Sequence, residues 1–317
     1  MAVAATNVRL NNGFKLPQVG LGTWKSEPNK VAEAVKDAID IGYRHIDCAF
    51  AYENEKEVGL AIQAKINEGV VKRDDLFITS KVWNTFHSKN LVLDCLKRSL
   101  KDLQIEYVDL YLIHWPMGYE EGGSLFPQDA DKQWLLSNVD YTETWEGMEQ
   151  CCRLGLARSI GLSNFNSQQI QRILDMAEIK PVTNQVECHP YFKQQKLMDF
   201  CKSKGITLTA YACLGSPSRP WVTVTDPVVM DDPIIGVLAE KYKKTSAQIC
   251  LRYQVQRGVI VIPKSVNKER ILSNFQIFDF KLSDADMKSI DDIPDQPRGF
   301  RLEWVKHHQH YPFNIPF

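Results

Sequence analysis

LFITSKVWNTFHSKNLVLDCLKRSLKDLQIEYVDLYLIH, residues 76–114, contains the repeating unit that decides the fold. Two short apolar runs, 76–81 and 108–114, flank a segment with helical spacing of its apolar residues over 88–103. Apolar runs that do not alternate with polar residues are typical of parallel strands covered on both faces. The stretch therefore predicts a strand, a helix and a second, parallel strand.

The same strand-then-helix order occurs eight times along the chain. The expected strands are 19–24, 43–47, 76–81, 108–114, 157–163, 183–187, 206–211 and 259–263. The helices that follow them are 29–41, 54–68, 88–103, 142–154, 167–176, 194–204, 246–256 and 268–274. Eight such units favour an α/β fold of the (β/α)8 TIM-barrel type, with residues 1–317 as a single domain. A doubly wound sheet is disfavoured, because Gly20-Leu21-Gly22 supplies only two of the three glycines of its phosphate-binding fingerprint.

Several segments lie outside the eight units. Residues 8–17 predict an N-terminal β-hairpin that caps the bottom of the barrel, with Asn12-Gly13 as its turn. Residues 282–290 predict an extra helix, with Ser283 as its N-cap. Three long loops, 116–138, 215–232 and 295–317, lack periodicity, and the first two are expected to rise over the top face. Loops of this length in a compact domain are usually functional.

Composition excludes several classes of protein. Lys plus Arg number 38 and Asp plus Glu 39, a net charge of −1, so neither nucleic acid nor an anionic membrane is an expected partner. The 8 cysteines form no CxxC pair, which indicates reduced, buried thiols. No apolar run reaches the length of about 18 residues that predicts a membrane span. We expect a cytoplasmic monomer that acts on small molecules.

Four polar side chains follow three neighbouring strands. Asp47, Lys81 and His114 end strands 43–47, 76–81 and 108–114, and Tyr52 lies in the loop after the first of these. Each residue alone has a plain structural explanation, but in a barrel the C-terminal strand ends meet at one mouth. Lys81 can lower the pKa of Tyr52, Asp47 can hold Lys81, and His114 can orient a carbonyl oxygen. Hydride from a nicotinamide would complete a carbonyl reduction.

At this point the chain resembles the aldo-keto reductase superfamily, over essentially its whole length. The similar stretches are GLGTW, GYRHIDCAFAYENE, ITSKVW, YLIHWP, IGLSNF, NQVECHP, GSPSRPW, VIPKSVNKERI and YPFN. They look like the aldose and aldehyde reductase branch, with animal and insect character. The resemblance implies NADPH-dependent reduction of aldehydes and ketones, with Tyr52 as proton donor and Asp47, Lys81 and His114 completing a catalytic tetrad.

The resemblance also implies that NADPH lies extended across the barrel top. Ser163, Asn164 and Gln185 would hold its carboxamide, and Tyr211 would stack on its nicotinamide. The remaining implied contacts are Gly22, Thr23 and Trp24 near the nicotinamide half, Leu214 and Ser216 over the pyrophosphate, Lys264, Ser265 and Arg270 around the 2′-phosphate, and Asn274 toward the adenine. A phosphate monoester favours guanidinium, ammonium and hydroxyl donors, which favours NADPH over NADH. Ser273 stands where the family often has Glu or Gln, which weakens the expected adenine contact.

Aromatic residues dominate the implied substrate pocket. Its walls match Trp24, Ala51, Trp83, Trp115, Phe126 and Trp221, and Trp304 lies on the last loop. Such walls suit flat or apolar carbonyl compounds. That last loop departs most from the family and usually sets substrate choice; insect relatives make a 3-dehydroecdysteroid one conceivable substrate. Its histidines, 307, 308 and 310, have poor spacing for a metal and are interpreted as surface residues.

Three other functions compete with this interpretation. A metal-dependent barrel hydrolase would use His45, Asp47, Glu187 and His189, but it leaves Tyr52 and Lys81 unexplained. A Schiff-base aldolase would use Lys81 as nucleophile, but Asp47 would keep that amine charged. A non-catalytic NADPH-binding relative is opposed by the intact tetrad. Metal analysis, borohydride trapping and turnover assays separate these alternatives.

Overall fold

A computed structural model describes residues 6–27, 29–315 and 317 of the chain. Its main sheet has eight strands in the order β12-β11-β10-β9-β6-β5-β4-β3, and every pair of neighbouring strands is parallel. The strands are β3 (Leu21–Gly22), β4 (His45–Asp47), β5 (Phe77–Val82), β6 (Leu110–Ile113), β9 (Ile160–Ser163), β10 (Thr183–Glu187), β11 (Thr207–Tyr211) and β12 (Ile260–Val261). Parallel bridges from Val19 to Val261 and from Gly22 to Lys264 bring the two edges of the sheet together. The expected eight parallel strands are therefore confirmed.

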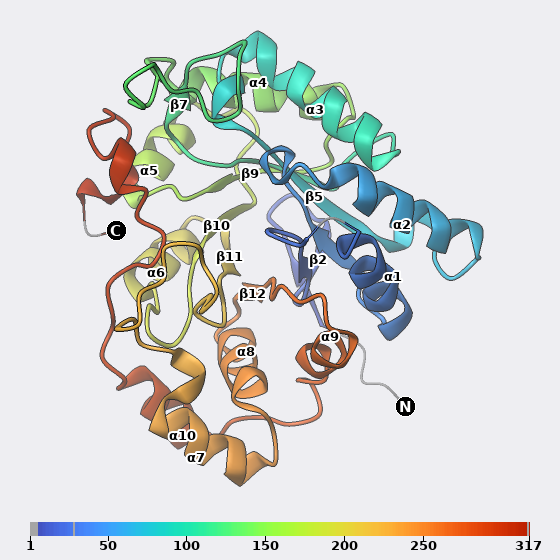
Figure 1. Ribbon diagram of the computed structural model, residues 1–317, viewed down its shortest axis with the longest axis vertical. Coiled ribbons are helices and arrows are strands. Elements are labelled where there is room, and N and C mark those ends of the chain that lie inside the picture. The colour runs from blue at the N-terminus through green and yellow to red at the C-terminus, as the bar shows by residue number, and fades with distance from the viewer. Residues whose placement is uncertain (1–5, 28, 316) are drawn as a thin grey trace.

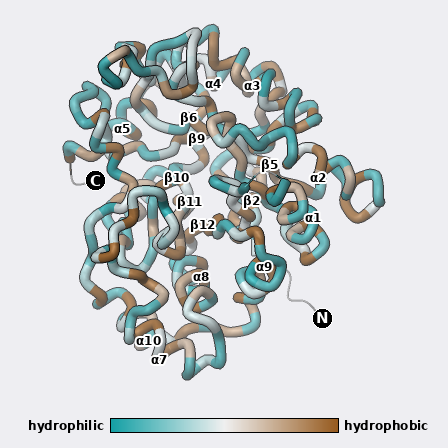
Figure 2. The backbone as a smooth tube through the Cα atoms, viewed as in Figure 1, coloured by the Kyte–Doolittle hydropathy of each residue, from teal (hydrophilic) through white to brown (hydrophobic). Residues whose placement is uncertain are grey.

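Helices follow the strands and surround them (Figure 1). Those of the repeating units are α1 (Val31–Ile41), α2 (Glu55–Asn67), α3 (Lys89–Leu103), α4 (Tyr141–Arg153), α5 (Ser167–Met176), α6 (Gln195–Ser203), α8 (Ser246–Gln256) and α9 (Lys268–Phe275). Hydrophobic and hydrophilic residues alternate along these outer helices (Figure 2). Each helix can therefore bury one side against the sheet and leave the other in water.

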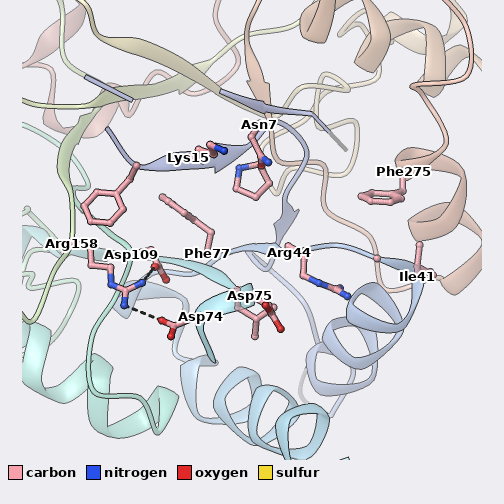
Figure 3. A pocket seen from close by; sticks show the side chains of 14 residues that line it. Asn7, Lys15, Ile41, Arg44, Asp74, Asp75, Phe77, Asp109, Arg158 and Phe275 are labelled. Atoms are coloured by element: carbon pink, nitrogen blue, oxygen red, sulfur yellow. Dashed lines mark hydrogen bonds and ion pairs between the residues drawn. The ribbon is translucent and has the colours of Figure 1, made fainter. Parts of the chain in front are cut away.

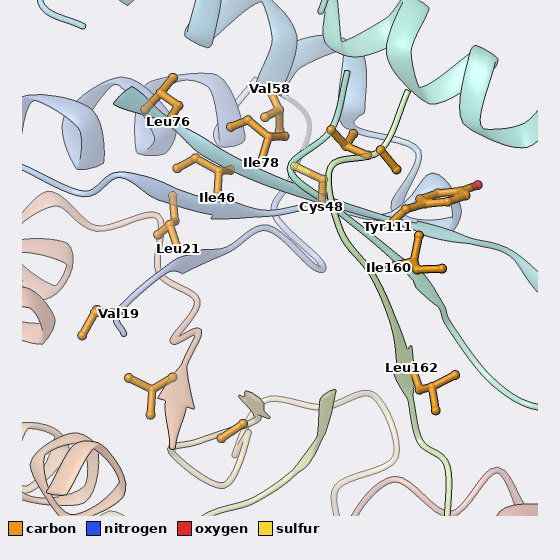
Figure 4. Packing of buried hydrophobic residues seen from close by; sticks show 14 of the residues in the cluster. Val19, Leu21, Ile46, Cys48, Val58, Leu76, Ile78, Tyr111, Ile160 and Leu162 are labelled. Atoms are coloured by element: carbon orange, nitrogen blue, oxygen red, sulfur yellow. The ribbon is translucent and has the colours of Figure 1, made fainter. Parts of the chain in front are cut away.

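The main core lies between the strands and this ring of helices. All six residues of β5 are buried. Ile46 of β4 and Ile78 of β5 pack in one cluster with Val58 of α2 (Figure 4). A strand buried on both faces needs apolar residues at successive positions, which explains why the strands appear as continuous apolar runs.

The N-terminal hairpin consists of β1 (Asn7–Arg9) and β2 (Lys15–Pro17), paired antiparallel. Its turn contains Gly13 at φ 93°, a backbone conformation that glycine adopts at little cost. Leu10 and Leu16 form a buried cluster with residues at the N-terminal ends of the strands, among them Phe77. The hairpin is thus anchored at the end of the sheet opposite to Asp47 and Lys81.

Two parts of the chain differ from expectation. Helix α7 (Pro233–Tyr242) follows the loop 215–232 and was not predicted, although Asp232 caps it and Pro233 begins it. The loop 116–138 contains a short antiparallel pair, β7 (Gly118–Tyr119) and β8 (Leu136–Ser137).

The extra helix α10 (Asp284–Asp291) is present, as expected, with Ser283 as its N-cap. Among the described residues, no helix is long and apolar enough to cross a membrane.

Candidate active site

Lys81 stands at the centre of the polar cluster at the strand ends. It is completely buried, and its Nζ donates to Asp47 Oδ1 at 2.6 Å and to the carbonyl oxygen of Cys48 at 2.8 Å. The same ammonium donates to Tyr52 Oη at 3.4 Å. Asp47, Lys81 and Tyr52 therefore lie in contact, as expected. The contact of Lys81 with Asp47 is the shorter one, and that with Tyr52 is the longer one.

Tyr52 occupies the last position of a short 3-10 turn, Phe50–Tyr52, directly after the strand that ends at Asp47. Burial raises the pKa of its phenol well above the ordinary value, and the Asp47 carboxylate raises that pKa further. The expectation that Lys81 lowers this pKa is not met, because the pKa is raised. Asp47 lies closer to the ammonium than the phenol does, so it offsets the cation's effect on Tyr52. Tyr52 is consequently held in its protonated, proton-donating form.

His114 follows β6 and faces Tyr52, with the two rings edge to face at 5.6 Å. Burial lowers the pKa of His114 well below its ordinary value, and the Lys81 ammonium lowers it further. The imidazole is therefore neutral, and its Nδ1 has no hydrogen-bond partner in the described part of the chain. A neutral imidazole with one N–H can donate to a substrate oxygen without competing for the proton of Tyr52.

A hydrogen-bonded chain connects the tetrad with the residues expected at the nicotinamide. Gln185 Nε2 donates to Asp47 Oδ2 at 2.7 Å. Ser163 Oγ donates to the carbonyl oxygen of Gln185 at 2.8 Å and accepts from Asn164 Nδ2 at 3.1 Å. Tyr211 Oη donates to Asn164 Oδ1 at 2.8 Å. The four residues lie beside the tetrad, three of them on the adjacent strands β9, β10 and β11 and Asn164 directly after β9. Amide, hydroxyl and aromatic groups are therefore gathered there.

Thr23 and Gly22 form the other side of the mouth. Thr23 Oγ1 donates to the carbonyl oxygen of Asp47 at 2.8 Å. A side chain at Gly22 would bring its Cβ within 2.8 Å of the Ile262 carbonyl oxygen, so this close approach of two strands requires glycine. Trp24 is half-buried. Its ring centroid lies 6.2 Å from that of Trp221, in a tilted arrangement, and 5.6 Å from that of Phe300, edge to face.

The expected phosphate cluster lies where β12 leads into α9. Lys264 and Arg270 are exposed, and neither forms an ion pair with a carboxylate in the described residues. Ser265 is buried, and its Oγ accepts from the backbone N–H of Asn267, the N-cap of α9. Burial lowers the pKa of Lys264. Two uncompensated cations beside a hydroxyl and a helix N-terminus suit a phosphate monoester. Asn274 is buried in α9, and Leu214 and Ser216 lie in the loop after β11.

Aromatic residues form a nearly continuous rim above the tetrad. Successive ring contacts of 5.4 to 6.3 Å run along Trp83, Phe126, Trp134, Trp304, Trp221 and Trp24. Trp115 and Ala51 belong to the cluster that includes Trp83. Phe126, Trp221 and Trp304 are 38 to 47% exposed. Large apolar groups left open to water around a polar centre indicate a binding site for an apolar ligand.

Trp134, Phe300 and Glu187 belong to this region although the sequence did not single them out as pocket residues. Trp134 stacks on Trp304 at 6.0 Å, and Phe300 contacts Tyr211 at 5.2 Å. Glu187, considered above only as a metal ligand, accepts the backbone N–H groups of Gly299 and Phe300. The sequence signal that could have identified Trp134 is an aromatic residue in a long loop. No sequence pattern indicates that Glu187 contacts Gly299.

Of the three histidines of the last loop, His307 is exposed as expected, whereas the other two differ from that expectation. His308 was expected at the surface, but it is buried, and its Nε2 lies 2.9 Å from the Ser137 carbonyl oxygen. His310 is half-buried and packs edge to face on Tyr141. Within the described residues, no group of three His, Cys, Asp or Glu side chains is arranged to hold a metal ion.

Comparison with known proteins agrees with this geometry. The model of the Aldo/keto reductase family matches residues 18–295. The chain is 47% identical to aldo-keto reductase family 1 member A1 of Gallus gallus, with 100% of both chains covered. It is 50% identical to estradiol 17 beta-dehydrogenase 5 of Mus musculus, over 96% of this chain and 97% of the relative. The solved aldose reductase of Schistosoma japonicum superposes with a TM-score of 0.93 at 45% identity, covering 98% of this chain and 100% of that one.

Proposed function

The chain belongs to the aldo/keto reductase family, whose members are oxidoreductases, and we propose that it reduces aldehydes and ketones to alcohols with NADPH as hydride donor. One observation carries the proposal: the Tyr52 hydroxyl, held protonated, lies 3.4 Å from Lys81 and faces a neutral His114 in the mouth of the sheet. A carbonyl oxygen placed between Tyr52 and His114 meets two hydrogen-bond donors.

In this mechanism NADPH, when bound, supplies hydride to the carbonyl carbon. The protein supplies the proton. His114 orients the carbonyl oxygen, and Tyr52 donates its phenolic proton as negative charge develops there. Lys81 then stabilises the phenolate that remains, because its ammonium already donates to Tyr52 Oη. Asp47 holds Lys81 in place, and Gln185 holds Asp47.

The cofactor assignment is supported by two groups of donors, one beside the tetrad and the other where β12 leads into α9. Asn164, Ser163 and Gln185 offer amide and hydroxyl groups to a carboxamide, and Tyr211 offers a flat ring. Lys264 and Arg270 favour NADPH, because NADH lacks the phosphate that they would bind. Replacing Arg270 by Met should weaken NADPH binding by about tenfold or more while leaving NADH binding nearly unchanged.

The aromatic rim supports apolar, flat carbonyl compounds as substrates, such as aromatic aldehydes. Ketosteroids, including 3-dehydroecdysteroids, are the bulkier candidates of the same apolar class. We further propose that residues 1–317 act as one domain and as a cytoplasmic monomer, with the hairpin closing the bottom of the barrel and the long loops 116–138 and 215–232 covering its mouth.

The test is NADPH oxidation with a panel of aromatic aldehydes, aldoses and ketosteroids, for the wild type and Tyr52→Phe. Loss of the proton donor should reduce kcat by about 10²- to 10⁴-fold, while NADPH binding, followed by protein fluorescence, stays within about twofold. Tight NADPH binding by the wild type without turnover on any carbonyl would favour the non-catalytic alternative. Equal loss of NADPH binding in Tyr52→Phe would give Tyr52 a structural role instead.

A further inference from the structure

A second cavity of about 500 Å³ lies at the end of the sheet opposite to the tetrad (Figure 3). The hairpin β1–β2 forms one wall, and the segments that lead into β4, β5, β6 and β9, together with the end of α9, form the others. This volume falls within the usual range of about 300 to 1,000 Å³ for small-molecule sites. The proposed reaction uses none of the residues that line it.

One part of the cavity wall is apolar. Its apolar lining consists of Phe14, Pro17, Ile41, Leu76, Phe77 and Phe275. Phe77 and Phe275 are almost completely buried, so they form a firm surface, whereas Phe14 is 44% exposed at the hairpin turn. Three phenylalanine rings around one space favour a flat or aliphatic body over a strongly hydrated one.

The acidic residues that line the cavity already have partners. Asp109 Oδ2 accepts from Arg73 Nη2 at 2.8 Å and from the backbone N–H of Ile78. Asp74 Oδ1 accepts from Tyr107 Oη at 2.7 Å and from Arg158 Nη2 at 3.0 Å. Asp75 accepts from the backbone N–H of Lys72 at 2.8 Å. Asp74 and Asp109 are therefore paired with arginines, whereas the exposed Asp75 has only a backbone donor among the described residues.

Two of the three cations that line the cavity have no carboxylate partner among the residues that the structure describes, whereas Arg158 is paired with Asp74. Lys15, on β2, and Arg44, just before β4, form no ion pair with a carboxylate in the described part of the chain. Apart from these two, Arg158 and the three aspartates, the eight other lining residues carry no charged side chain. Arg44 uses Nη1 to donate to the carbonyl oxygens of Ile39 and Tyr43, which fixes the guanidinium at 2.9 and 2.8 Å from them. An arginine held in this way keeps further N–H groups for an anion.

From these contacts we propose that the cavity beneath the hairpin is a binding site for a small carboxylate with a flat apolar body. The body lies against Phe77 and Phe275, and the carboxylate lies between Lys15 and Arg44. The site is separate from the catalytic mouth, because Arg44 precedes the strand that ends at Asp47 and Phe77 begins the strand that carries Lys81.

The experiment is calorimetric titration of the NADPH-saturated protein with 1-naphthoate, beside its neutral analogue naphthalene-1-methanol. Lys15→Glu reverses one charge at an exposed position where the lysine side chain makes no hydrogen bond to a described residue. Lys97→Glu, on the outer side of α3, is the matched control. We expect 1-naphthoate to bind the wild type and Lys97→Glu alike, and Lys15→Glu about tenfold or more weakly. The neutral analogue should bind all three proteins equally and more weakly than 1-naphthoate binds the wild type.

Two results would overturn the proposal. One is absence of 1-naphthoate binding to the wild type. The other is equal binding by Lys15→Glu and Lys97→Glu, which would place the ligand elsewhere, the catalytic mouth included. Carbonyl reduction is measured on the same preparations, so a failed site and a failed reductase assignment give different results.

Discussion

Glu187 accepts the backbone N–H of Gly299 on both carboxylate oxygens, at 2.9 and 3.1 Å. The carbonyl oxygen of the same glycine accepts the indole N–H of Trp221 at 2.7 Å. The end of β10, the loop after β11 and the last loop are thereby joined at one residue, Gly299. Phe300 and Trp304 follow directly, so Glu187 determines where the rim of the substrate pocket lies.

Glu187→Gln should therefore raise the KM for aromatic aldehydes by about tenfold, with a smaller effect on kcat, because an amide cannot accept from Gly299 on both of its atoms. Glu149→Gln is the matched control, since Glu149 is a buried carboxylate that accepts the backbone N–H groups of Glu178 and Ile179 outside the site. Both variants should lose about 2 to 3 kcal/mol of unfolding free energy. If KM rises equally in Glu187→Gln and Glu149→Gln, the effect at Glu187 results from general destabilisation and not from its place at the pocket rim.

Lys81→Met should be strongly destabilising, by about 3 to 5 kcal/mol, because it leaves the Asp47 carboxylate buried without its cation. The double variant Asp47→Asn, Lys81→Met removes both charges and should recover part of that loss. Urea unfolding of the two single variants and the double variant measures the coupling. Strictly additive losses would mean that the 2.6 Å contact contributes little to stability.

Sequence patterns predicted the eight strands because each is covered on both faces and therefore appears as an apolar run, as in β5. They also predicted Asp47, Lys81 and His114 together, because strand ends converge in a parallel barrel. The Trp134–Trp304 stack and the Glu187–Gly299 contact were not predictable in this way. Each joins loops far apart in the chain, where no periodicity indicates register. Helix α7 was missed, although Asp232-Pro233 is a typical helix start.

Glu55 should make the protein less stable as the pH rises. Burial raises the pKa of this carboxyl from 4.5 to about 7, against the opposing effect of its hydrogen bond from Ser80. Between these two values the folded protein binds more protons than the unfolded chain, so stability falls through this window. Glu55→Gln keeps a neutral side chain there at every pH. The unfolding free energy of the variant minus that of the wild type should therefore be about 2 kcal/mol larger at pH 8 than at pH 5.5. Urea unfolding at both pH values tests this, and a difference that does not change with pH would contradict it.

The stack of Trp134 on Trp304 narrows the pocket rim from two loops, and we expect it to select slender substrates. Trp304→Ala opens the rim and removes an aromatic contact of about 0.5 to 1.5 kcal/mol. The kcat/KM for a flat aromatic aldehyde should therefore fall by about two- to tenfold, whereas that for a ketosteroid should rise. Trp134→Ala should act in the same direction, because it removes the other half of the stack.

Trp304→Phe is the control that separates the stack from folding, since it keeps an aromatic ring at the same position. It should retain most of the wild-type preference between the two substrates. The measured quantity is the ratio of kcat/KM for aldehyde and ketosteroid, from which changes in the amount of active enzyme cancel. If Trp304→Ala and Trp134→Ala both leave this ratio at the wild-type value, the stack does not control substrate width, and selection must occur deeper in the pocket, at Trp83 and Trp115.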